Sequence, residues 1–257
     1  MQGMIVDVHA HLTDERLHGR LGTVIASARA AGVVRVVTCG VGPEDSLRAL
    51  ALRDDFVRVS LGIAPYDLRG YEEVIELIRR NRQLVDAVGE VGLDLYRGTR
   101  EGFEEQRRVF SEFIALAKEL DKPLVIHSRN AGKPAIEQLL SEGAERVVMH
   151  AYDGDVGAAK RAAERGFRFS IPPRIATSDQ KKALVRKLPL EALLIETDSP
   201  WLGPERTVLN EPKNAWFSVE WIARLKGIST DRVVEATYQN ALEVFGWSDL
   251  SCPEGVF

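Results

Sequence analysis

Residue types that bind metal ions recur in this sequence, each close to the end of a short apolar run. His127 follows the run PLVI, for example, and His150 follows RVVM. Four neutral imidazoles and two carboxylates hold such positions, which is enough to serve two divalent cations. Nitrogen and oxygen ligands together suit Zn²⁺ or Mn²⁺, whereas Mg²⁺ prefers an oxygen-rich shell. The six candidate ligands are His9, His11, Glu90, His127, His150 and Asp198.

The first two candidates, His9 and His11, are separated by a single residue. On a β-strand, residues two apart point to the same face, so both imidazoles can reach one ion. Asp7 has the same parity, whereas Val6, Val8 and Ala10 are expected to point towards a layer of helices. The pattern therefore predicts a polar face on this strand, directed to the interior of the fold. A lone strand histidine would more often be a buried structural residue.

The carboxylate candidate Glu90 lies in GEVGLD, between Gly89 and Gly92. Glycines at these positions permit another backbone to approach closely, and a carboxylate buried there is costly without a cation. A structural ion pair is the alternative role for Glu90 on its own. In the company of four histidines, the residue is interpreted as a ligand that bridges two metal ions.

The segment LLIETDSPWL places Glu196 and Asp198 on one face, just before Pro200. Asp198 is interpreted as a metal ligand and general base, with a helix cap or a turn as the alternative. For Glu196 two roles remain open, support of a metal ligand and a plain ion pair.

Short β-branched runs alternate with longer segments of helical periodicity along most of the chain. In the segment 102–120, Phe103, Phe110 and Phe113 fall at helical spacing, which indicates a buried helix face. Eight alternating units in 257 residues favour an α/β fold, a (β/α)₈ TIM barrel, as one domain over residues 1–257. The expected strands are 4–8, 33–39, 56–63, 84–88, 123–126, 146–149, 167–171 and 192–195. The expected helices include 70–81, 102–120, 133–142, 155–165 and 178–187, with an extra C-terminal helical tail at 216–226 and 230–245.

This architecture explains how ligands so far apart in the sequence can meet. The C-terminal ends of the strands in such a barrel converge on one mouth, where active sites lie. Two dications and two carboxylates would give the ligand shell a net charge of about +2, which attracts an anionic phosphodiester. The net charge of the whole chain is −4, which does not favour a general basic coat for nucleic acid, so the attraction must be local.

Composition places the chain among ordinary globular enzymes. Charged residues make up 28% and hydrophobic residues 45%. Cys39 and Cys252 match no disulfide or zinc pattern, so Cys39 is expected to be a small buried residue and Cys252 a tail residue. No signal peptide or membrane-spanning run is evident, and we expect a cytoplasmic protein without an obligate protein partner.

Several motifs together resemble the TatD family of metal-dependent deoxyribonucleases, which belongs to an amidohydrolase-like superfamily. They are DVHAHL, GEVGLD, PLVIHSRNA, ETDSPWLGP, LNEPKNAW and TYQNALEVFG, which occur in order from residue 7 to residue 246. The resemblance implies the same (β/α)₈ barrel. It also implies a hydrolase dependent on two divalent metal ions per subunit, Mg²⁺ or Mn²⁺ for activity and Zn²⁺ or Ni²⁺ in many crystals. One ion would be held by His9, His11, Glu90 and Asp198, and the other by Glu90, His127 and His150.

The sequence departs from the family pattern at two places. The family commonly has a Gly-x-His-Pro segment after the third strand, where this chain has GIAPYD with Ala64 in place of the histidine. The family's HCFSG is HAYDG here, which keeps His150 and changes its neighbours. The first departure puts nuclease efficiency and substrate choice in doubt without removing an expected metal ligand.

The resemblance predicts a DNase, most simply a 3′–5′ exonuclease on single-stranded ends, with catalytic roles for Asp198 and Glu90. Hydrolysis of another ester or amide, such as D-aminoacyl-tRNA deacylation, is the first alternative, and a non-catalytic ligand-binding barrel is the second. Arg129 could clamp a phosphate or form a salt bridge at the rim. Tyr66, Tyr152 and Trp201 could stack on a base. In the long loop 199–214, substrate contacts and a structural role are both open for Asn210, Lys213 and Asn214.

Overall fold

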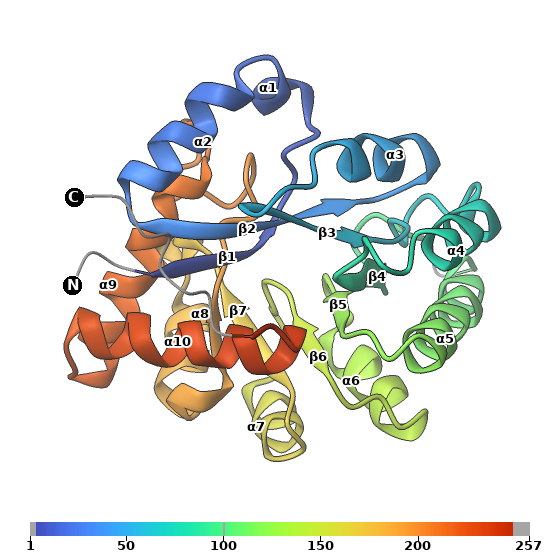
Figure 1. Cartoon of the computed structure of the whole chain (residues 1–257). Coiled ribbons are helices and arrows are strands. Elements are labelled where there is room, and N and C mark those ends of the chain that lie inside the picture. Colours follow the sequence, from blue (N-terminus) through green and yellow to red (C-terminus); the bar gives the residue numbers. More distant parts are fainter. Residues whose placement is uncertain (1–3, 100, 249–257) are drawn as a thin grey trace.

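Eight parallel strands pair in sequence order around a barrel, each with the next along the chain (Figure 1). The computed structural model describes residues 4–99 and 101–248. The expected (β/α)₈ barrel is confirmed. Strand boundaries differ from the predicted ones, most at the fourth strand, which begins three residues later and contains Glu90 instead of ending before it. The first and fifth strands likewise extend to include His9 and His127, which were expected to follow them. The strands are β1 (Ile5–Ala10), β2 (Val33–Gly40), β3 (Val57–Leu61), β4 (Ala87–Gly92), β5 (Leu124–His127), β6 (Val147–Met149), β7 (Arg168–Ile171) and β8 (Leu193–Ile195).

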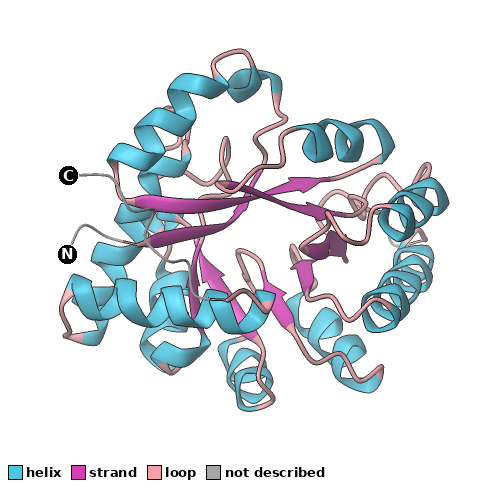
Figure 2. Cartoon of the chain, in the orientation of Figure 1, coloured by secondary structure: helices cyan, strands magenta, loops and turns pink. Residues whose placement is uncertain are grey.

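Helices surround the strands as an outer layer (Figure 2). Five of them match the segments expected from periodicity, and two more form the expected C-terminal tail. The first three α-helices were not among those expected segments. The α-helices are α1 (Glu15–His18), α2 (Leu21–Ala30), α3 (Pro43–Ala51), α4 (Tyr71–Arg80), α5 (Phe103–Glu119), α6 (Gly132–Ser141), α7 (Val156–Glu164), α8 (Asp179–Lys187), α9 (Ala215–Lys226) and α10 (Thr230–Phe245), and the 3₁₀ helices are η1 (Pro173–Thr177), η2 (Leu190–Ala192) and η3 (Pro212–Asn214).

Helix α10 lies across the N-terminal ends of the strands. The side-chain amide of Asn240 donates to the carbonyl oxygens of Leu190 and Leu193, at 2.9 and 2.8 Å, where β8 begins. Trp247, just beyond the helix, donates to Asp86, which directly precedes β4. The opposite end of the barrel, formed by the C-terminal ends of the strands, is therefore left for the functional site.

The inward-facing apolar side chains form a cluster with α10 that is separate from the outer helix–strand core. Val6 and Val8 belong to this cluster, together with residues from β2, β4, β5, β6 and β8. Side chains from six strands can meet only inside the barrel, so Val6 and Val8 point inwards. The prediction that they point towards the helices is wrong, whereas it holds for Ala10, which belongs to the outer core.

A β-bulge in β1 explains why the predicted alternation fails. The step from Asp7 to Ala10 covers three residues of β1 but only two residues of β2. The extra residue resets the alternation of side chains. His9 therefore faces the interior directly after Val8, which also does so.

Asp7 lies at the seam between β1 and β8, so the prediction that it shares the inward face of His9 is also wrong. Its two carboxylate oxygens accept hydrogen bonds from the backbone N–H and the hydroxyl of Thr197, at 2.8 and 2.5 Å. The N–H of Asp198 donates to the carbonyl oxygen of His9 at 2.8 Å. These bonds join β1 to the segment after β8 and close the barrel. Burial raises the pKa of Asp7 to about 7, although the hydrogen bonds from Thr197 act in the opposite direction.

Candidate metal centre

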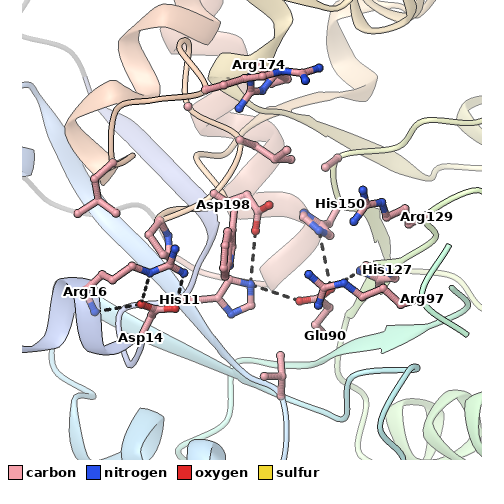
Figure 3. A pocket seen from close by; sticks show the side chains of 18 of the residues that line it. His11, Asp14, Arg16, Glu90, Arg97, His127, Arg129, His150, Arg174 and Asp198 are labelled. Atoms are coloured by element: carbon pink, nitrogen blue, oxygen red, sulfur yellow. Dashed lines mark hydrogen bonds and ion pairs between the residues drawn. The ribbon is translucent and has the colours of Figure 1, made fainter.

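The structure brings all six predicted metal-binding residues together at the C-terminal mouth of the barrel (Figure 3). Five of them line a cavity of about 1070 Å³, and His9 lies fully buried behind them. Glu90 and His127 belong to strands, whereas His11, His150 and Asp198 follow strand ends directly or within three residues. Asp198 has a φ of +53°, a conformation that few residues other than glycine adopt and that is found preferentially at functional sites.

Two imidazole nitrogens lie close to each other and to one oxygen of each of two carboxylates. The Nε2 atoms of His9 and His11 lie 3.3 Å apart, and each lies 3.4–3.5 Å from Oε2 of Glu90 and 3.4 Å from Oδ1 of Asp198. Ligand atoms bound to Zn²⁺ at 2.0–2.1 Å in tetrahedral geometry would be about 3.3–3.4 Å from one another. The distances from the two imidazole nitrogens to each other and to each carboxylate oxygen therefore match those between ligands of one cation.

A second group shares Glu90 with the first. Its other oxygen, Oε1, lies 2.5 Å from Nδ1 of His127 and 3.8 Å from Nε2 of His150. The short contact to His127 is a hydrogen bond, so a cation between these atoms would have to separate them. This group has the residue types for a second cation, but its spacing is less close to that of a bound ion.

Each of the four imidazoles has its remaining nitrogen held by the protein. Nδ1 of His9 contacts the Cys39 thiol at 3.2 Å, and Nδ1 of His11 contacts the Cys39 carbonyl oxygen, also at 3.2 Å. Nε2 of His127 lies 2.9 Å from Oδ2 of Asp94. Such partners fix the orientation of a histidine and leave its other nitrogen for a metal.

Glu196 holds the fourth imidazole. Its Oε2 lies 3.0 Å from Nδ1 of His150 and accepts a hydrogen bond from the Ser170 hydroxyl at 2.5 Å. Its Oε1 accepts from the backbone N–H of Ala151. Of the two roles left open by the sequence, this arrangement favours support of His150.

Glycines allow the strands to approach closely around Glu90, as expected. A side chain at Gly89 would meet the carbonyl oxygen of Val125 at 2.3 Å, and one at Gly92 would meet that of His127 at 2.1 Å. Both glycines also have positive φ values, +150° and +143°. No other residue fits at either position without moving the backbone of β5.

The carboxylates and imidazoles shift each other's pKa values. Burial opposes the charged form of His11, but hydrogen bonds with Asp198 and Glu90 outweigh burial and raise its pKa to about 10. Burial likewise opposes charge on His127, where Glu90 and Asp94 raise the pKa to about 9. Burial acts to raise the pKa of Asp198, yet the surrounding histidines hold it well below its usual range. The carboxylates therefore stay ionised in the metal-free protein, as metal ligands must.

Arginines and aromatic side chains form the rim of the cavity. Arg129 lines the cavity as predicted, and its guanidinium lies 3.6 Å from the ring centre of Tyr96. The side chains of Tyr66 and Trp201 are 41% and 46% exposed and also line the cavity. Arg97 lies over Tyr66 and Arg16 lies over Trp201, at 4.7 and 3.8 Å.

Tyr152 is not positioned for contact with a substrate. It is 1% exposed, its ring packs edge-on against Phe169, and its hydroxyl donates to the carbonyl oxygen of Asp155. The prediction of substrate contact fails because the chain folds this side chain under the loop after His150.

The three loop residues do not line the cavity either. Asn210 is fully buried, and its amide donates to the carbonyl oxygens of Thr197 and Trp201. Asn214 donates to Asn210, and Lys213 pairs with Glu211. The structural role is therefore the one that the geometry supports for Asn210, Lys213 and Asn214.

Other polar residues at the site were missed from the sequence. Asp94 is fully buried against His127, and its place four residues after Glu90 in GEVGLD was the available signal. Arg97, Arg174 and Arg206 line the cavity, but arginines in loops carry no distinguishing pattern. Contact between Cys39 and the histidines was equally invisible, although its burial was expected.

The absence of the family's third-strand histidine does not alter the candidate ligand set. Ala64 follows β3, is 5% exposed and does not line the cavity, so the missing histidine leaves no gap among the six candidate ligands.

Cys252 lies outside the described residues. No helix in the described part of the chain is long and apolar enough to cross a membrane.

Comparison with known proteins agrees with this geometry. The family model of TatD-related DNases matches residues 6–246. The protein named Deoxyribonuclease TATDN3 of Homo sapiens is 41% identical over 258 residues, which cover 94% of each chain. A Bacillus subtilis protein named as the uncharacterized metal-dependent hydrolase YabD is 34% identical, over 94% of this chain and 99% of its own.

A solved structure shows the same architecture. The crystal structure of YjjV, a TatD homologue from Escherichia coli K12, superimposes with a TM-score of 0.90 at 26% sequence identity and covers 96% of this chain and all of its own. The family resemblance noted in the motifs is therefore confirmed over nearly the whole chain. The protein belongs to the TatD-related DNases and is a hydrolase that acts on ester bonds.

Proposed function

We propose that this protein hydrolyses phosphodiester bonds of DNA with two divalent cations held by the six residues at the barrel mouth. The observation that carries the proposal is the cluster of His9, His11, Glu90 and Asp198, in which the two imidazole nitrogens lie 3.3–3.5 Å from each other and from both carboxylates, as ligands of one cation do. The relatives named as deoxyribonuclease and metal-dependent hydrolase support the choice of reaction.

The first cation would be held by His9, His11, Glu90 and Asp198. The second would be held by His127 Nδ1 and His150 Nε2, with Glu90 shared between the two ions. The chemistry of the donors fits Zn²⁺ and Mn²⁺ best, although Mg²⁺ remains a candidate for activity.

Cations held there would supply an activated water and stabilise negative charge on the phosphoryl oxygens. Asp198 then accepts the proton of the attacking water at its carboxylate and returns it to the leaving oxygen. In the metal-free protein the surrounding histidines hold the pKa of Asp198 well below its usual range, which keeps it ionised as a ligand. Glu196 and Asp94 keep His150 and His127 oriented throughout.

The rim of the cavity supports a nucleic-acid substrate with unpaired bases. Exposed Trp201 and Tyr66 present aromatic surfaces next to arginines, a combination that binds bases by stacking and phosphates by charge. A strand end without a complementary strand can offer both groups at once. For this reason we propose exonuclease action on single-stranded DNA ends, with the 3′–5′ direction taken from the family resemblance.

The direct test is hydrolysis of 3′-labelled single-stranded DNA by the metal-loaded protein and by its Asp198→Asn variant. Loss of a general base typically lowers the rate by a factor of about 10²–10⁴, and we expect a decrease in this range. Asp55→Asn, at a fully exposed position, is the matched control and should retain activity.

The same assay is repeated with RNA and with an aminoacyl-tRNA as substrates. Preferential turnover of the aminoacyl ester, with no cleavage of any strand, would replace the nuclease proposal by an ester hydrolase. No turnover of any of these substrates by protein with confirmed metal content would favour a non-catalytic barrel. Wild-type rates from Asp198→Asn with metals bound would remove Asp198 from the proton-accepting role.

A further inference from the structure

Two arginines line one wall of the cavity without a counter-ion. Arg174 comes from η1, which follows β7, and Arg206 comes from the loop after β8. The backbone N–H of Arg174 donates to the carbonyl oxygen of Leu202 at 2.9 Å and so ties these two segments together. The contact fixes the backbone of Arg174 beside the loop that carries Arg206.

Neither guanidinium forms an ion pair with a carboxylate in the described part of the chain. Glu205 also lines the cavity, yet it pairs with neither arginine. Nη1 of Arg174 is enclosed by protein and has no hydrogen-bond acceptor. Burial, and then the charge of Arg206, lower the pKa of Arg174, which is the opposite of what a neighbouring carboxylate would do. Two like charges are thus held at the cavity wall with no acceptor for their donors, an arrangement that an anion would relieve.

This pair lies apart from the other arginines of the mouth. Figure 3 shows Arg174 on one side of the centre, above Asp198, and Arg97 and Arg129 on another side, beside His127. The latter two are stacked on tyrosine rings, whereas no aromatic ring lies under Arg174 among the described residues. The cavity therefore offers cationic groups on two sides of the six candidate ligands.

We propose that Arg174 and Arg206 form an anion subsite that binds the phosphate next to the scissile one in a polynucleotide. The inference rests on the proposed function, because it takes the scissile phosphate to lie at the metal centre. A guanidinium offers paired N–H donors that match the oxygens of a phosphate. A substrate with a single phosphate or a simple ester cannot occupy both places, so the subsite selects a strand of at least two phosphates.

The test compares dithymidine phosphate, TpT, with its 5′- and 3′-phosphorylated forms, pTpT and TpTp. Affinities are measured by calorimetry on the metal-free protein, so that no turnover is needed. The wild-type protein should bind one of the two phosphorylated forms about tenfold or more tightly than TpT, the effect of charge-assisted hydrogen bonds to one phosphate. Arg174→Ala and Arg206→Ala should each lose most of this preference.

The exposed Arg69, paired with Asp67 on the surface, provides the control variant Arg69→Ala, which should keep the wild-type preference. Thermal unfolding of each variant checks that the fold is retained. A wild-type protein without the preference, or Arg174→Ala with the preference intact, would overturn the subsite. Equal weakening of all three ligands in both arginine variants would also overturn it, because the arginines would then not discriminate the added phosphate.

Steady-state kinetics of the metal-loaded protein provide an independent test. On a longer strand, Arg174→Ala should raise KM by about tenfold, while hydrolysis of bis(4-nitrophenyl) phosphate, which has a single phosphate, should be unchanged. If the arginine-dependent preference is present but no diester is hydrolysed, the subsite stands and the proposed function fails. Equal loss on both substrates would contradict the subsite and leave the proposed function in place.

Discussion

At the residue scale, the candidate metal centre depends on side chains that do not touch a cation themselves. Glu196 lies against the outer nitrogen of His150, and Asp94 lies against the outer nitrogen of His127. These carboxylates select the tautomer that leaves the inner nitrogen free. They also make each imidazole a stronger electron-pair donor.

Replacement of Glu196 by glutamine tests this role. The amide retains the size of the side chain but not its charge, so the affinity for Zn²⁺ should fall by about 10–100-fold while the fold is kept. Competition with a chromophoric chelator measures this affinity. Glu164→Gln, at an exposed position at the end of α7, should bind Zn²⁺ like the wild type. Unchanged affinity in Glu196→Gln would show that the contact with His150 is a plain ion pair.

The raised pKa values of His11 and His127, about 10 and about 9, predict that metal binding depends on pH. Both imidazoles are protonated in the metal-free protein at pH 7 and must lose these protons to bind a cation. Affinity should therefore fall as pH falls from about 9 to 6, by about tenfold per pH unit for each proton released. Calorimetry in buffers of different ionisation enthalpy counts these protons. Binding without proton release would contradict the assignment.

The six candidate ligands could be found from the sequence because each combines a metal-binding residue type with the end of an apolar run. The residues that hold these ligands in place could not be found in this way. Cys39 contacts His9 only because β1 and β2 are neighbours at that level, and Asp94 reaches His127 through a turn after β4. Such contacts depend on the folded geometry of a loop and leave no periodic pattern in the chain.

At the scale of elements, β1 shows where strand periodicity is insufficient. The bulge between Asp7 and Ala10 changes which side chains point inwards, and no turn residue marks it in the sequence. The result is useful for the site, because it moves Asp7 out of the cavity and into the seam with β8. There it closes the barrel directly below the proposed ligands His9 and Asp198.

The buried carboxyl of Asp7 predicts a pH dependence of stability. Its pKa is about 7 in the folded chain and 3.8 in the reference state, so the folded chain holds more protons between these values. The free energy of unfolding should therefore decrease as pH rises from about 4 to about 7. Urea unfolding of metal-free wild-type protein and of Asp7→Asn across this range measures the effect. The variant should lack the part of the decline due to Asp7, and identical declines would argue against a raised pKa.

At the scale of the whole molecule, the candidate metal centre and the apolar cluster under α10 lie at opposite ends of the barrel. The mouth holds the candidate metal centre, whereas α10 covers the other end with an apolar cluster. The alternation of strands and helices was sufficient to predict this architecture, because eight units of this length leave few other ways to bury both faces of a parallel sheet. The role of α10 was not predictable, since its amphipathic pattern does not say which surface it covers.

A substitution in α10 should therefore affect stability alone. Phe245 is 6% exposed and stacks on Trp247, with ring centres 4.5 Å apart. Phe245→Ala should lower the free energy of unfolding by about 3–5 kcal/mol, as is usual for the loss of a buried phenylalanine. The affinity for Zn²⁺ should stay unchanged under conditions where the variant is folded. A parallel loss of metal affinity would mean that the two ends of the barrel are coupled.

The most direct measurement for the whole account is anomalous diffraction from crystals grown with Mn²⁺ or Zn²⁺. Two peaks are expected at the barrel mouth, one among His9, His11, Glu90 and Asp198 and the other beside Glu90, His127 and His150. A mouth without any peak, in crystals of protein that binds no such cation in solution, would contradict the metal centre. A single peak would contradict the two-cation arrangement.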